Sequence, residues 1–446
     1  MIEQGLGPLA MALASGRTTS EELTERALAA AAEGEGPTCF VSLRGEKALA
    51  EARAVDALRK AGWRSRPFAG IPISIKDLFD EEGVVTTAGS KALADAAPAA
   101  ADAAIVHSLR RAGFVVVGRT VMTEFAYSGV GLNPHYGTPA SPWDRETRRI
   151  PGGSTSGGAV SVADGMAAAT IGTDTGGSCR IPAAFCGIVG FKPTAERIPQ
   201  DGCFPLSFSL DSIGPLGNSV DCCAILDDIM AGGEGMGAEP GPVAGLRLGV
   251  LDNFVLDGMD DTVAEAMERA LTLLADAGAH VEEFELPELA DLPGLNAAGG
   301  FAAADSYALH RALMAEKGDL YDPRVIGRIR RGADISAADY IDLMKARAAM
   351  QQATDRATAH YDAVVMPTVP IVPPAISDLN ADADYMAINM LCLRNPSIGN
   401  FLNRPNISLP CHRPGEAPVG LMLMGQRGRD RDLFAIATGV EGVLAE

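Results

Sequence analysis

Positive charge is scarce in this sequence of 446 residues. It contains 37 Lys and Arg residues against 57 Asp and Glu residues, which gives a formal net charge of −20. Binding to nucleic acid depends on clustered Lys and Arg side chains that neutralise phosphates. The charge balance therefore argues against nucleic acid as a direct ligand.

The sequence also has little that would direct a chain into a membrane. It has no stretch of about 18 predominantly apolar residues, and its apolar segment 363–377 contains four prolines. The first Lys or Arg is Arg17, whereas a signal peptide begins with positive charge. Eight cysteines are scattered without the C-x2-C pairs of zinc sites, which favours a reducing compartment. We expect a cytoplasmic protein that does not bind a membrane.

Motifs of several common enzyme classes are missing. Neither G-x4-G-K-[ST] nor G-x-G-x-x-G occurs, so no nucleotide-binding loop is indicated. The G-x-S-x-G pattern of a nucleophile elbow is absent, and none of the six histidines adjoins a glycine-serine motif. A Ser-His-Asp triad whose members are brought together by the fold remains an alternative, although nothing in the sequence points to it. Without H-x3-H or clustered Asp/His spacing, we predict neither a metal nor a cofactor.

What the sequence does contain is an α/β rhythm. Isoleucines alternate with other residues over 71–76, which predicts a short strand ending at Lys76. A helical pattern then runs to Gly113, and the apolar run 114–117 follows directly, which makes half of a βαβ unit. The rhythm returns over 245–286, and 301–361 is mainly helical in pattern. With no repeat and no low-complexity linker, one large α/β domain is favoured.

Both ends of the chain also carry patterns that predict secondary structure. Thr19 and Glu22 fit a capping box at the start of an amphipathic helix. Near the other end, 361–372 has a strand pattern followed by a Pro-rich loop, and a helical pattern passes through Leu433, Ile436 and Val440.

Glycine and serine are concentrated in residues 150–194, and this region carries the chemistry. Serines without a neighbouring histidine need another base, and a neutral lysine can serve. Lys76, at the end of an apolar strand, is the candidate. Keeping a lysine neutral at pH 7 requires a pKa about 3.4 units below its usual value, or about 4.6 kcal/mol, which burial can supply. The alternative is a lysine that reaches from a strand edge into solvent.

Several motifs together resemble the amidase signature family of serine hydrolases. They are, in chain order, GIPISIKD (70–77), TTAGS (86–90), PGGSTSGG (151–158), GTDTGGSCRIPA (172–183) and GIVGFKPT (187–194). Ser154 and Ser178 are 24 residues apart, which is similar to the spacing in that family. The resemblance implies an α/β fold with a mixed, mostly parallel central sheet covered by helices on both faces. It implies a single domain over 1–446, with a catalytic core at about 60–220, a variable, mainly helical region at 221–360 and C-terminal strands and helix at 361–446.

The resemblance also assigns roles to residues of this chain. It implies Ser178 as the nucleophile, Ser154 as a bridging serine after a cis peptide bond, and Lys76 as the base. Backbone N–H groups would stabilise an oxyanion, Asp174 and Arg180 would form a supporting ion pair, and two residues would line the acyl side of the substrate. The residues implied for the oxyanion hole are Thr175, Gly176 and Gly177, and those implied for the lining are Tyr127 and Ser128.

Three positions depart from the family pattern. Thr155 replaces a common serine, Asp164 interrupts an Ala-rich helix, and Cys179 follows the implied nucleophile where Ile or Val is usual. None of these changes removes a catalytic atom. A thiol nucleophile at Cys179 lacks support because no histidine is close to it in sequence.

The resemblance implies an amidase that hydrolyses a small carboxamide through an acyl-enzyme, without a cofactor. One alternative is the A subunit of the tRNA-dependent amidotransferase, which shares these motifs and passes ammonia to a partner; here MTEFAYSGVGLNPHYG (122–137) differs from its usual sequence. Another is a catalytically silent binding protein, which the intact Lys76, Ser154 and Ser178 disfavour. The sequence does not identify the substrate, although Arg180, Arg394 and Arg404 could bind a substrate carboxylate. A homodimer is compatible with the sequence.

Overall fold

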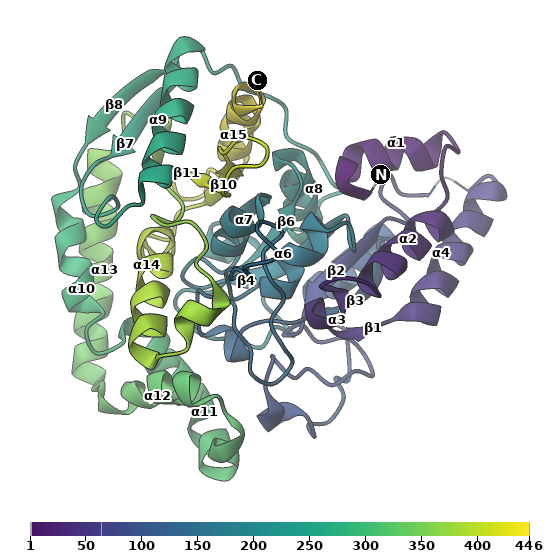
Figure 1. Ribbon diagram of the computed structural model, residues 1–446, viewed down its shortest axis with the longest axis horizontal. Coiled ribbons are helices and arrows are strands. Elements are labelled where there is room, and N and C mark those ends of the chain that lie inside the picture. Colours follow the sequence, from purple (N-terminus) through teal and green to yellow (C-terminus); the bar gives the residue numbers. More distant parts are fainter. Residues whose placement is uncertain (1, 64, 446) are drawn as a thin grey trace.

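A mixed β-sheet runs through the whole molecule (Figure 1). The computed structural model describes residues 2–63 and 65–445. In these residues the sheet has eleven strands in the order β1-β3-β2-β4-β6-β5-β10-β11-β9-β7-β8. The strands are β1 (Phe40–Leu43), β2 (Pro72–Lys76), β3 (Val115–Thr120), β4 (Ala169–Asp174), β5 (Val189–Lys192), β6 (Ser212–Gly217), β7 (Arg247–Leu251), β8 (His280–Phe284), β9 (Ala363–Pro367), β10 (Asn406–Pro410) and β11 (Gly420–Met424).

The predicted α/β fold with a mixed sheet is confirmed, but fewer strand pairs are parallel than expected. Among the described strands, β2 pairs in parallel with β3 and β4, and β7 with β8 and β9. The other six pairs, including β1–β3 at the edge, are antiparallel. The family resemblance implied a mostly parallel sheet, whereas only the two segments with a βαβ rhythm form parallel parts. Between these parts, β6, β5, β10 and β11 all pair antiparallel with their neighbours.

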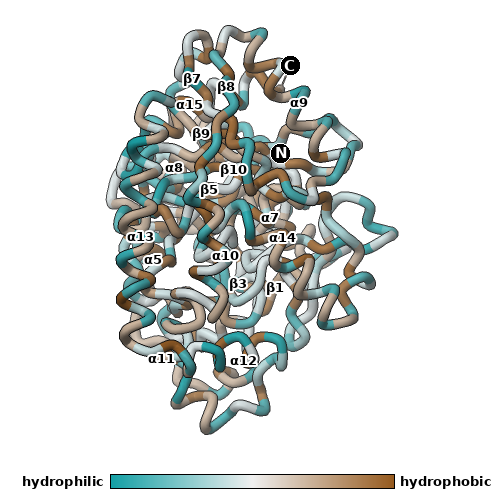
Figure 2. The backbone as a smooth tube through the Cα atoms, turned by 90° about the vertical axis from the view of Figure 1, so that its left-hand side faces the viewer, coloured by the Kyte–Doolittle hydropathy of each residue, from teal (hydrophilic) through white to brown (hydrophobic). Residues whose placement is uncertain are grey.

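Fifteen α-helices are present in the described residues. They are α1 (Leu6–Ala14), α2 (Ser20–Ala31), α3 (Gly36–Cys39), α4 (Gly45–Lys60), α5 (Ala104–Ala112), α6 (Ser156–Ala163), α7 (Arg180–Cys186), α8 (Val220–Met230), α9 (Asp261–Asp276), α10 (Leu292–Leu295), α11 (Gly300–Lys317), α12 (Pro323–Arg330), α13 (Ala337–Ala357), α14 (Asp382–Phe401) and α15 (Asp430–Leu444). α11 and α12 lie at the end of the molecule opposite β7 and β8 (Figures 1 and 2). No described helix is long and apolar enough to cross a membrane.

Helices cover both faces of the sheet, as predicted. Val189 of β5 pairs with Gly217 of β6, and Gly190 pairs with Leu216, so Gly190 and Gly217 face opposite sides. A Cβ atom on Gly190 would collide with α7, and one on Gly217 would collide with α8. α6 and α14 pack beside α7, whereas α5 and α15 pack beside α8. The sheet is therefore the middle layer of three.

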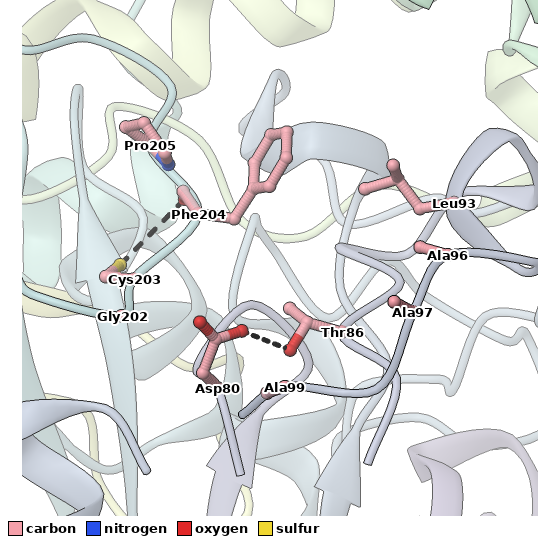
Figure 3. Close-up of a pocket in the computed structure, with 10 residues that line it drawn as sticks. All are labelled: Asp80, Thr86, Leu93, Ala96, Ala97, Ala99, Gly202, Cys203, Phe204 and Pro205. Carbon is pink, nitrogen blue, oxygen red and sulfur yellow. Dashed lines mark hydrogen bonds between the residues drawn. The ribbon is translucent and has the colours of Figure 1, made fainter. Parts of the chain in front are cut away.

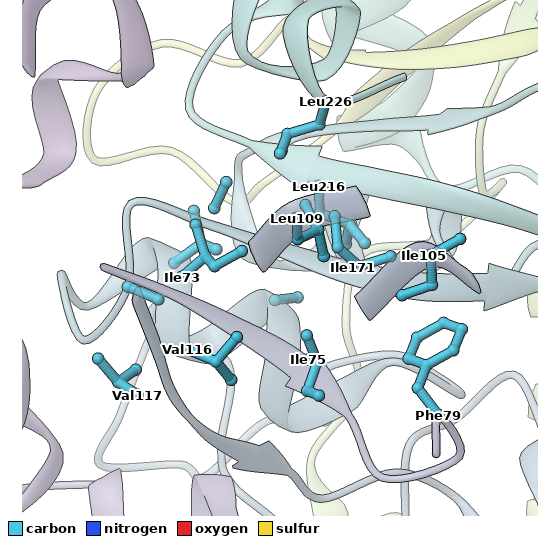
Figure 4. Packing of buried hydrophobic residues seen from close by; sticks show 14 of the residues in the cluster. Ile73, Ile75, Phe79, Ile105, Leu109, Val116, Val117, Ile171, Leu216 and Leu226 are labelled. Atoms are coloured by element: carbon cyan, nitrogen blue, oxygen red, sulfur yellow. The ribbon is translucent and has the colours of Figure 1, made fainter. Parts of the chain in front are cut away.

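β2 is buried along its whole length because helices cover it on both sides. Ile73 and Ile75 belong to one apolar cluster with Ile105 and Leu109 of α5 (Figure 4). Ser74 points to the other face, where its Oγ lies 3.0 Å from an Oγ on α6. Since side chains alternate along a strand, Lys76 shares the face of Ser74 and lies beneath α6.

Local signals at chain ends and helix ends agree with this structure, with one exception. The capping box at Thr19 and Glu22 forms, and Gly113 ends α5 in a left-handed conformation. The Pro-rich stretch after β9 is a loop as predicted, and the exception is α14 over 382–401, with Pro396 inside it, which the sequence patterns did not predict. The second half of α14 is buried nearly all around, so it lacks the one-sided apolar pattern by which a helix is recognised.

Candidate active site

Lys76 is fully buried at the end of β2 and does not reach solvent. Its Nζ donates hydrogen bonds to Ser154 Oγ at 2.8 Å and to Thr173 Oγ1 at 3.0 Å. Burial lowers the pKa of Lys76 from 10.5 to about 8, against the opposing effect of nearby acids and thiols. The strand-edge alternative is therefore wrong, and about a tenth of the lysine is neutral at pH 7.

Ser154 reaches Lys76 from a sharply bent segment. The Gly153–Ser154 peptide bond is cis, as the family resemblance implies. The segment is held on both sides, because Gly153 N–H donates to Gly129 O at 2.8 Å and Ser154 O accepts from Thr123 N–H at 3.1 Å. These bonds direct the Ser154 hydroxyl towards the lysine.

The loop between β4 and α7 carries Ser178 and is organised around Asp174. The Asp174 carboxylate forms a buried ion pair with Arg180 at 2.8 Å and accepts from the N–H groups of Gly177 at 2.7 Å and Cys179 at 3.1 Å. Although burial raises the pKa of Asp174, the Arg180 guanidinium outweighs it and holds that pKa well below its usual range. The implied ion pair exists in the structure, and its carboxylate also holds the amides of Gly177 and Cys179.

Ser178 lies next to the Ser154 segment with 3% of its surface exposed. Thr155 N–H donates to Ser178 O at 3.2 Å, which ties the two serine segments together. Gly177 has a φ of +130°, and a Cβ there would collide with Ile181 and Pro396, so the turn before Ser178 requires glycine. Among the described residues, no group accepts a hydrogen bond from the N–H of Gly176 or Ser178.

Three further residues belong to this site and were missed in the sequence. Thr173 holds Lys76 and lies within the GTDTGGSCRIPA motif, so the motif could have indicated it. Asp211 accepts a hydrogen bond from the Thr175 hydroxyl, and burial raises the pKa of Asp211 to about 6. Asn400, on α14, donates to Asp174 Oδ1 at 3.0 Å. No local pattern marks Asn400, because its contact depends on a distant helix.

The residues implied to line the substrate form a second hydrogen-bonded group. Ser128 Oγ donates to Asn389 Oδ1 at 2.9 Å and accepts from Tyr385 Oη at 2.8 Å, both on α14. Asn389 also accepts from Gly129 N–H, whose carbonyl holds Gly153. The half-buried Tyr127 precedes this segment. The implied lining is thus directly connected to the cis peptide bond.

Cavity size does not mark this site. One cavity of about 370 Å³ is lined by residues that include Asp80, hydrogen-bonded to Thr86, and Phe204 (Figure 3). Another, of about 600 Å³, has Asp211 and Arg347 in its wall. Neither is lined by Lys76, Ser154 or Ser178. The hydrogen-bonded groups identify the site instead. Within the described residues, no cluster of three or more His, Cys, Asp or Glu side chains is arranged to hold a metal ion.

Two of the three arginines considered for a carboxylate are paired with one inside the chain. Arg180 pairs with Asp174, and Arg404 pairs with Asp355 at 2.6 Å. Arg394 donates to backbone carbonyls, including that of Val255 at 2.7 Å.

Solved structures of known enzymes share this architecture. One described as an amidase matches with a TM-score of 0.89 and 31% identity, over 98% of this chain and 99% of that one. A peptide amidase from Stenotrophomonas maltophilia matches with a TM-score of 0.81 and 28% identity, over 99% and 97% of the two chains. The fold and these comparisons define an amidohydrolase, an enzyme that cleaves C–N amide bonds.

Comparison of the sequence with protein families also identifies the chain as an amidase. The family model described as Amidase matches residues 22–434, and the chain belongs to this family. A 2-amino-5-chloromuconic acid deaminase from Comamonas testosteroni is 37% identical over 410 residues, which cover 90% of this chain and 87% of that protein. The A subunit of a glutamyl-tRNA(Gln) amidotransferase from Roseiflexus sp. is 34% identical over 467 residues, covering 97% and 94%.

Proposed function

We propose that this enzyme hydrolyses a small carboxamide to a carboxylate and ammonia or an amine, through an acyl-enzyme on Ser178. The observation that carries the proposal is the 2.8 Å hydrogen bond between Lys76 Nζ and Ser154 Oγ in a fully buried setting. A buried lysine whose pKa is lowered to about 8 can accept a proton near neutral pH, which an exposed lysine cannot do.

The relay follows from what each group can do with a proton. Ser178 Oγ attacks the amide carbon as its proton passes to Ser154, and Ser154 passes its own proton to Lys76. Because a serine alkoxide is too basic to persist, Ser154 conducts the proton and Lys76 keeps it. Lys76 then returns the proton through Ser154 to the leaving nitrogen, and the C–N bond breaks. Water repeats the sequence on the acyl-enzyme and releases the carboxylate.

Backbone N–H groups of the nucleophile loop complete the proposed site. The family resemblance implied Thr175, Gly176 and Gly177 for the oxyanion hole. Because the N–H groups of Gly177 and Cys179 donate to Asp174, we assign the oxyanion instead to the amides of Gly176 and Ser178, with Thr175 beside them. Each such donor contributes about 3 kcal/mol to transition-state stabilisation. Gly177 supplies the left-handed turn that alternates the amides.

Cys179 is a poor alternative to Ser178. Its thiol is buried and donates to Gly214 O at 3.5 Å, and burial raises its pKa, which disfavours the reactive thiolate.

The A subunit of an amidotransferase is the second candidate function. It is supported by relatives such as the one from Roseiflexus sp., which match along nearly the full length of both chains. The two functions differ in whether the isolated chain acts alone on small amides. Eight free thiols agree with a cytoplasmic setting for either function.

Two measurements test the proposal. A fluorophosphonate should label Ser178, located by peptide mass spectrometry, and an adduct on Cys179 would overturn the assignment. Ammonia release by the isolated chain from aliphatic, aryl and dicarboxylic amides should then be detected. Release that occurs only with glutamine and in the presence of a partner protein would favour the amidotransferase function.

A further inference from the structure

Thr175 is the first residue of the loop between β4 and α7, and its side chain is held by Asp211. The Thr175 hydroxyl donates to Asp211 Oδ1, and each of the two residues is 5% exposed. Asp211 directly precedes β6, whose Ser212 pairs with Asp174 at the end of β4. The Ser212 hydroxyl donates to Asp174 O at 3.1 Å. Two side-chain hydrogen bonds therefore tie the start of the loop to the start of β6.

The second oxygen of Asp211 is fixed as well. Asp211 Oδ2 accepts from the N–H groups of Leu206 at 2.9 Å and Ser207 at 3.1 Å. Ser207 Oγ donates to Asp305 Oδ2 at 2.6 Å, and Asp305 Oδ1 accepts from Tyr340 Oη at 2.8 Å. Asp305 lies on α11 and Tyr340 on α13. Two helices outside the motif region thus hold the segment that binds the Asp211 carboxylate.

The peptide unit between Thr175 and Gly176 carries one of the N–H groups assigned to the oxyanion. Its orientation depends on the backbone angles of both residues, and Gly176 restricts them little because it has no side chain. The Gly176 N–H makes no hydrogen bond to a described residue that could fix it. Instead, Asp211 restrains Thr175 on one side of this unit, and Asp174 restrains Gly177 on the other.

Asp211 acts on the backbone of the loop and not on the proton relay. Both of its carboxylate oxygens are already acceptors, one for a hydroxyl and one for two N–H groups. Within the described residues, no hydrogen bond joins Asp211 to any of the three relay residues, and Lys76 donates to Ser154 and Thr173. The chemistry proposed above therefore leaves this buried carboxylate without a role.

We propose that Asp211 is a positioning residue, which directs the Gly176 N–H at the oxyanion by holding the Thr175 hydroxyl. The inference rests on the proposed amide hydrolysis at Ser178. An oxyanion donor that is held in place before reaction stabilises the transition state, where charge develops, more than the bound neutral amide. Loss of the bond between Thr175 and Asp211 should accordingly lower kcat and leave KM almost unchanged.

Thr175→Val tests this bond with little change in side-chain shape. Its kcat for ammonia release should fall about 10- to 100-fold, as expected for the loss of a hydrogen bond to a charged group, while KM changes by less than about threefold. Thr175→Ser keeps the hydroxyl and should keep most of the activity. Thr194→Val is a matched control in the turn after β5, because it removes another buried bond of this kind, from Thr194 Oγ1 to Asp430 Oδ2 at 2.8 Å. It should leave kcat unchanged.

A reversible inhibitor reports on the oxyanion directly. With a trifluoromethyl ketone of the same acyl chain as the amide, Ser178 Oγ adds to the carbonyl carbon, the serine proton passes to the relay and the carbonyl oxygen becomes an oxyanion. In the two Thr175 variants, the affinity for this ketone should fall by the same factor as kcat. Asp211→Asn should show similar losses, and adding Thr175→Val to it should cost little more, because both changes act on one bond.

The outcomes separate this inference from the proposed function. If the unaltered chain is neither labelled at Ser178 nor able to release ammonia from any amide, the proposed function fails. If that chain is active and Thr175→Val keeps its kcat and its ketone affinity, the positioning role of Asp211 is wrong and the function stands. A fall in kcat without a fall in ketone affinity would also overturn the inference, because the bond would then be structural only. Should Asp211→Asn not fold, the Thr175 variants still decide.

Discussion

The loop that holds Ser178 and the helix that holds Arg328 each bury a guanidinium, but they satisfy it in different ways. In the loop, Arg180 is neutralised by Asp174, and the pair organises the backbone amides around it. On α12, Arg328 has only neutral partners. The difference teaches that a buried guanidinium can be held in two ways, by an ion pair or by neutral groups alone.

Substitutions in the proposed relay of Lys76, Ser154 and Ser178 should lower activity more than substitutions elsewhere in the molecule. Ser178→Ala and Lys76→Arg should each lower kcat/KM by about 10⁴-fold or more, because one lacks the attacking oxygen and the other keeps a guanidinium that stays protonated. Ser154→Ala should lose less if water bridges the gap it leaves. Steady-state ammonia release measures all three. Near-normal activity in Lys76→Arg would mean that Lys76 is not the base.

The two arginines should differ clearly in their effect on stability. Arg180→Met leaves Asp174 buried and unpaired, so the free energy of unfolding should fall by about 3–5 kcal/mol. Arg328→Met removes a charge with no counter-charge, and its lost hydrogen bonds to neutral groups should cost about 1 kcal/mol or less. Urea unfolding followed by circular dichroism compares them. Equal losses would show that Arg328 has a structural partner after all.

The pH dependence of kcat/KM should separate the buried lysine of the relay from the arginines, which do not titrate. Lys76 can accept a proton only when neutral, so kcat/KM should rise about tenfold per pH unit below its pKa of about 8 and then level off. A neutral amide substrate keeps substrate ionisation out of the profile. Lys192 is a matched control because burial lowers its pKa to about 7, yet within the described residues it donates only to Pro193 O.

Lys192→Met should therefore leave the inflection of kcat/KM near pH 8 in place, whereas a profile that is flat or falls with pH would contradict the relay.

The free energy of unfolding should depend on pH in the same direction. The folded pKa of Lys76, about 8, is below the ordinary value of 10.5, so the unfolded chain binds more protons between these values. The contribution of Lys76 to stability should accordingly increase with pH across that window.

The proposed relay residues could be identified from the sequence because they lie in short contiguous motifs. Lys76 ends a strand whose alternation is visible, and Ser154 and Ser178 lie in glycine-rich turns whose order and spacing are specific. Arg328 and Asn400 could not be identified. They lie on α12 and α14, far from the motifs in sequence, and their contacts form only when those helices pack.

The fold was predictable to a similar degree and for a similar reason. The two βαβ units are local patterns, and both form. The antiparallel middle of the sheet depends on which distant strands meet, and sequence periodicity carries no information about that. α14 escaped prediction because its buried positions surround the helix and because Pro396 suggests a break.

Tyr385 joins the two regions and should produce the smallest effect. Its hydroxyl accepts from Arg328 and donates to Ser128, so Tyr385→Phe removes both bonds while keeping the aromatic ring beside the guanidinium. A single neutral hydrogen bond contributes about 1 kcal/mol, so kcat/KM for ammonia release should fall about fivefold. The inflection of kcat/KM near pH 8 should stay in place, because the relay is untouched. A merely structural role for Tyr385 would lower the free energy of unfolding and leave kcat/KM unchanged. A fall in kcat/KM at an unchanged inflection would instead make Tyr385 a residue that positions the proposed substrate lining at Ser128.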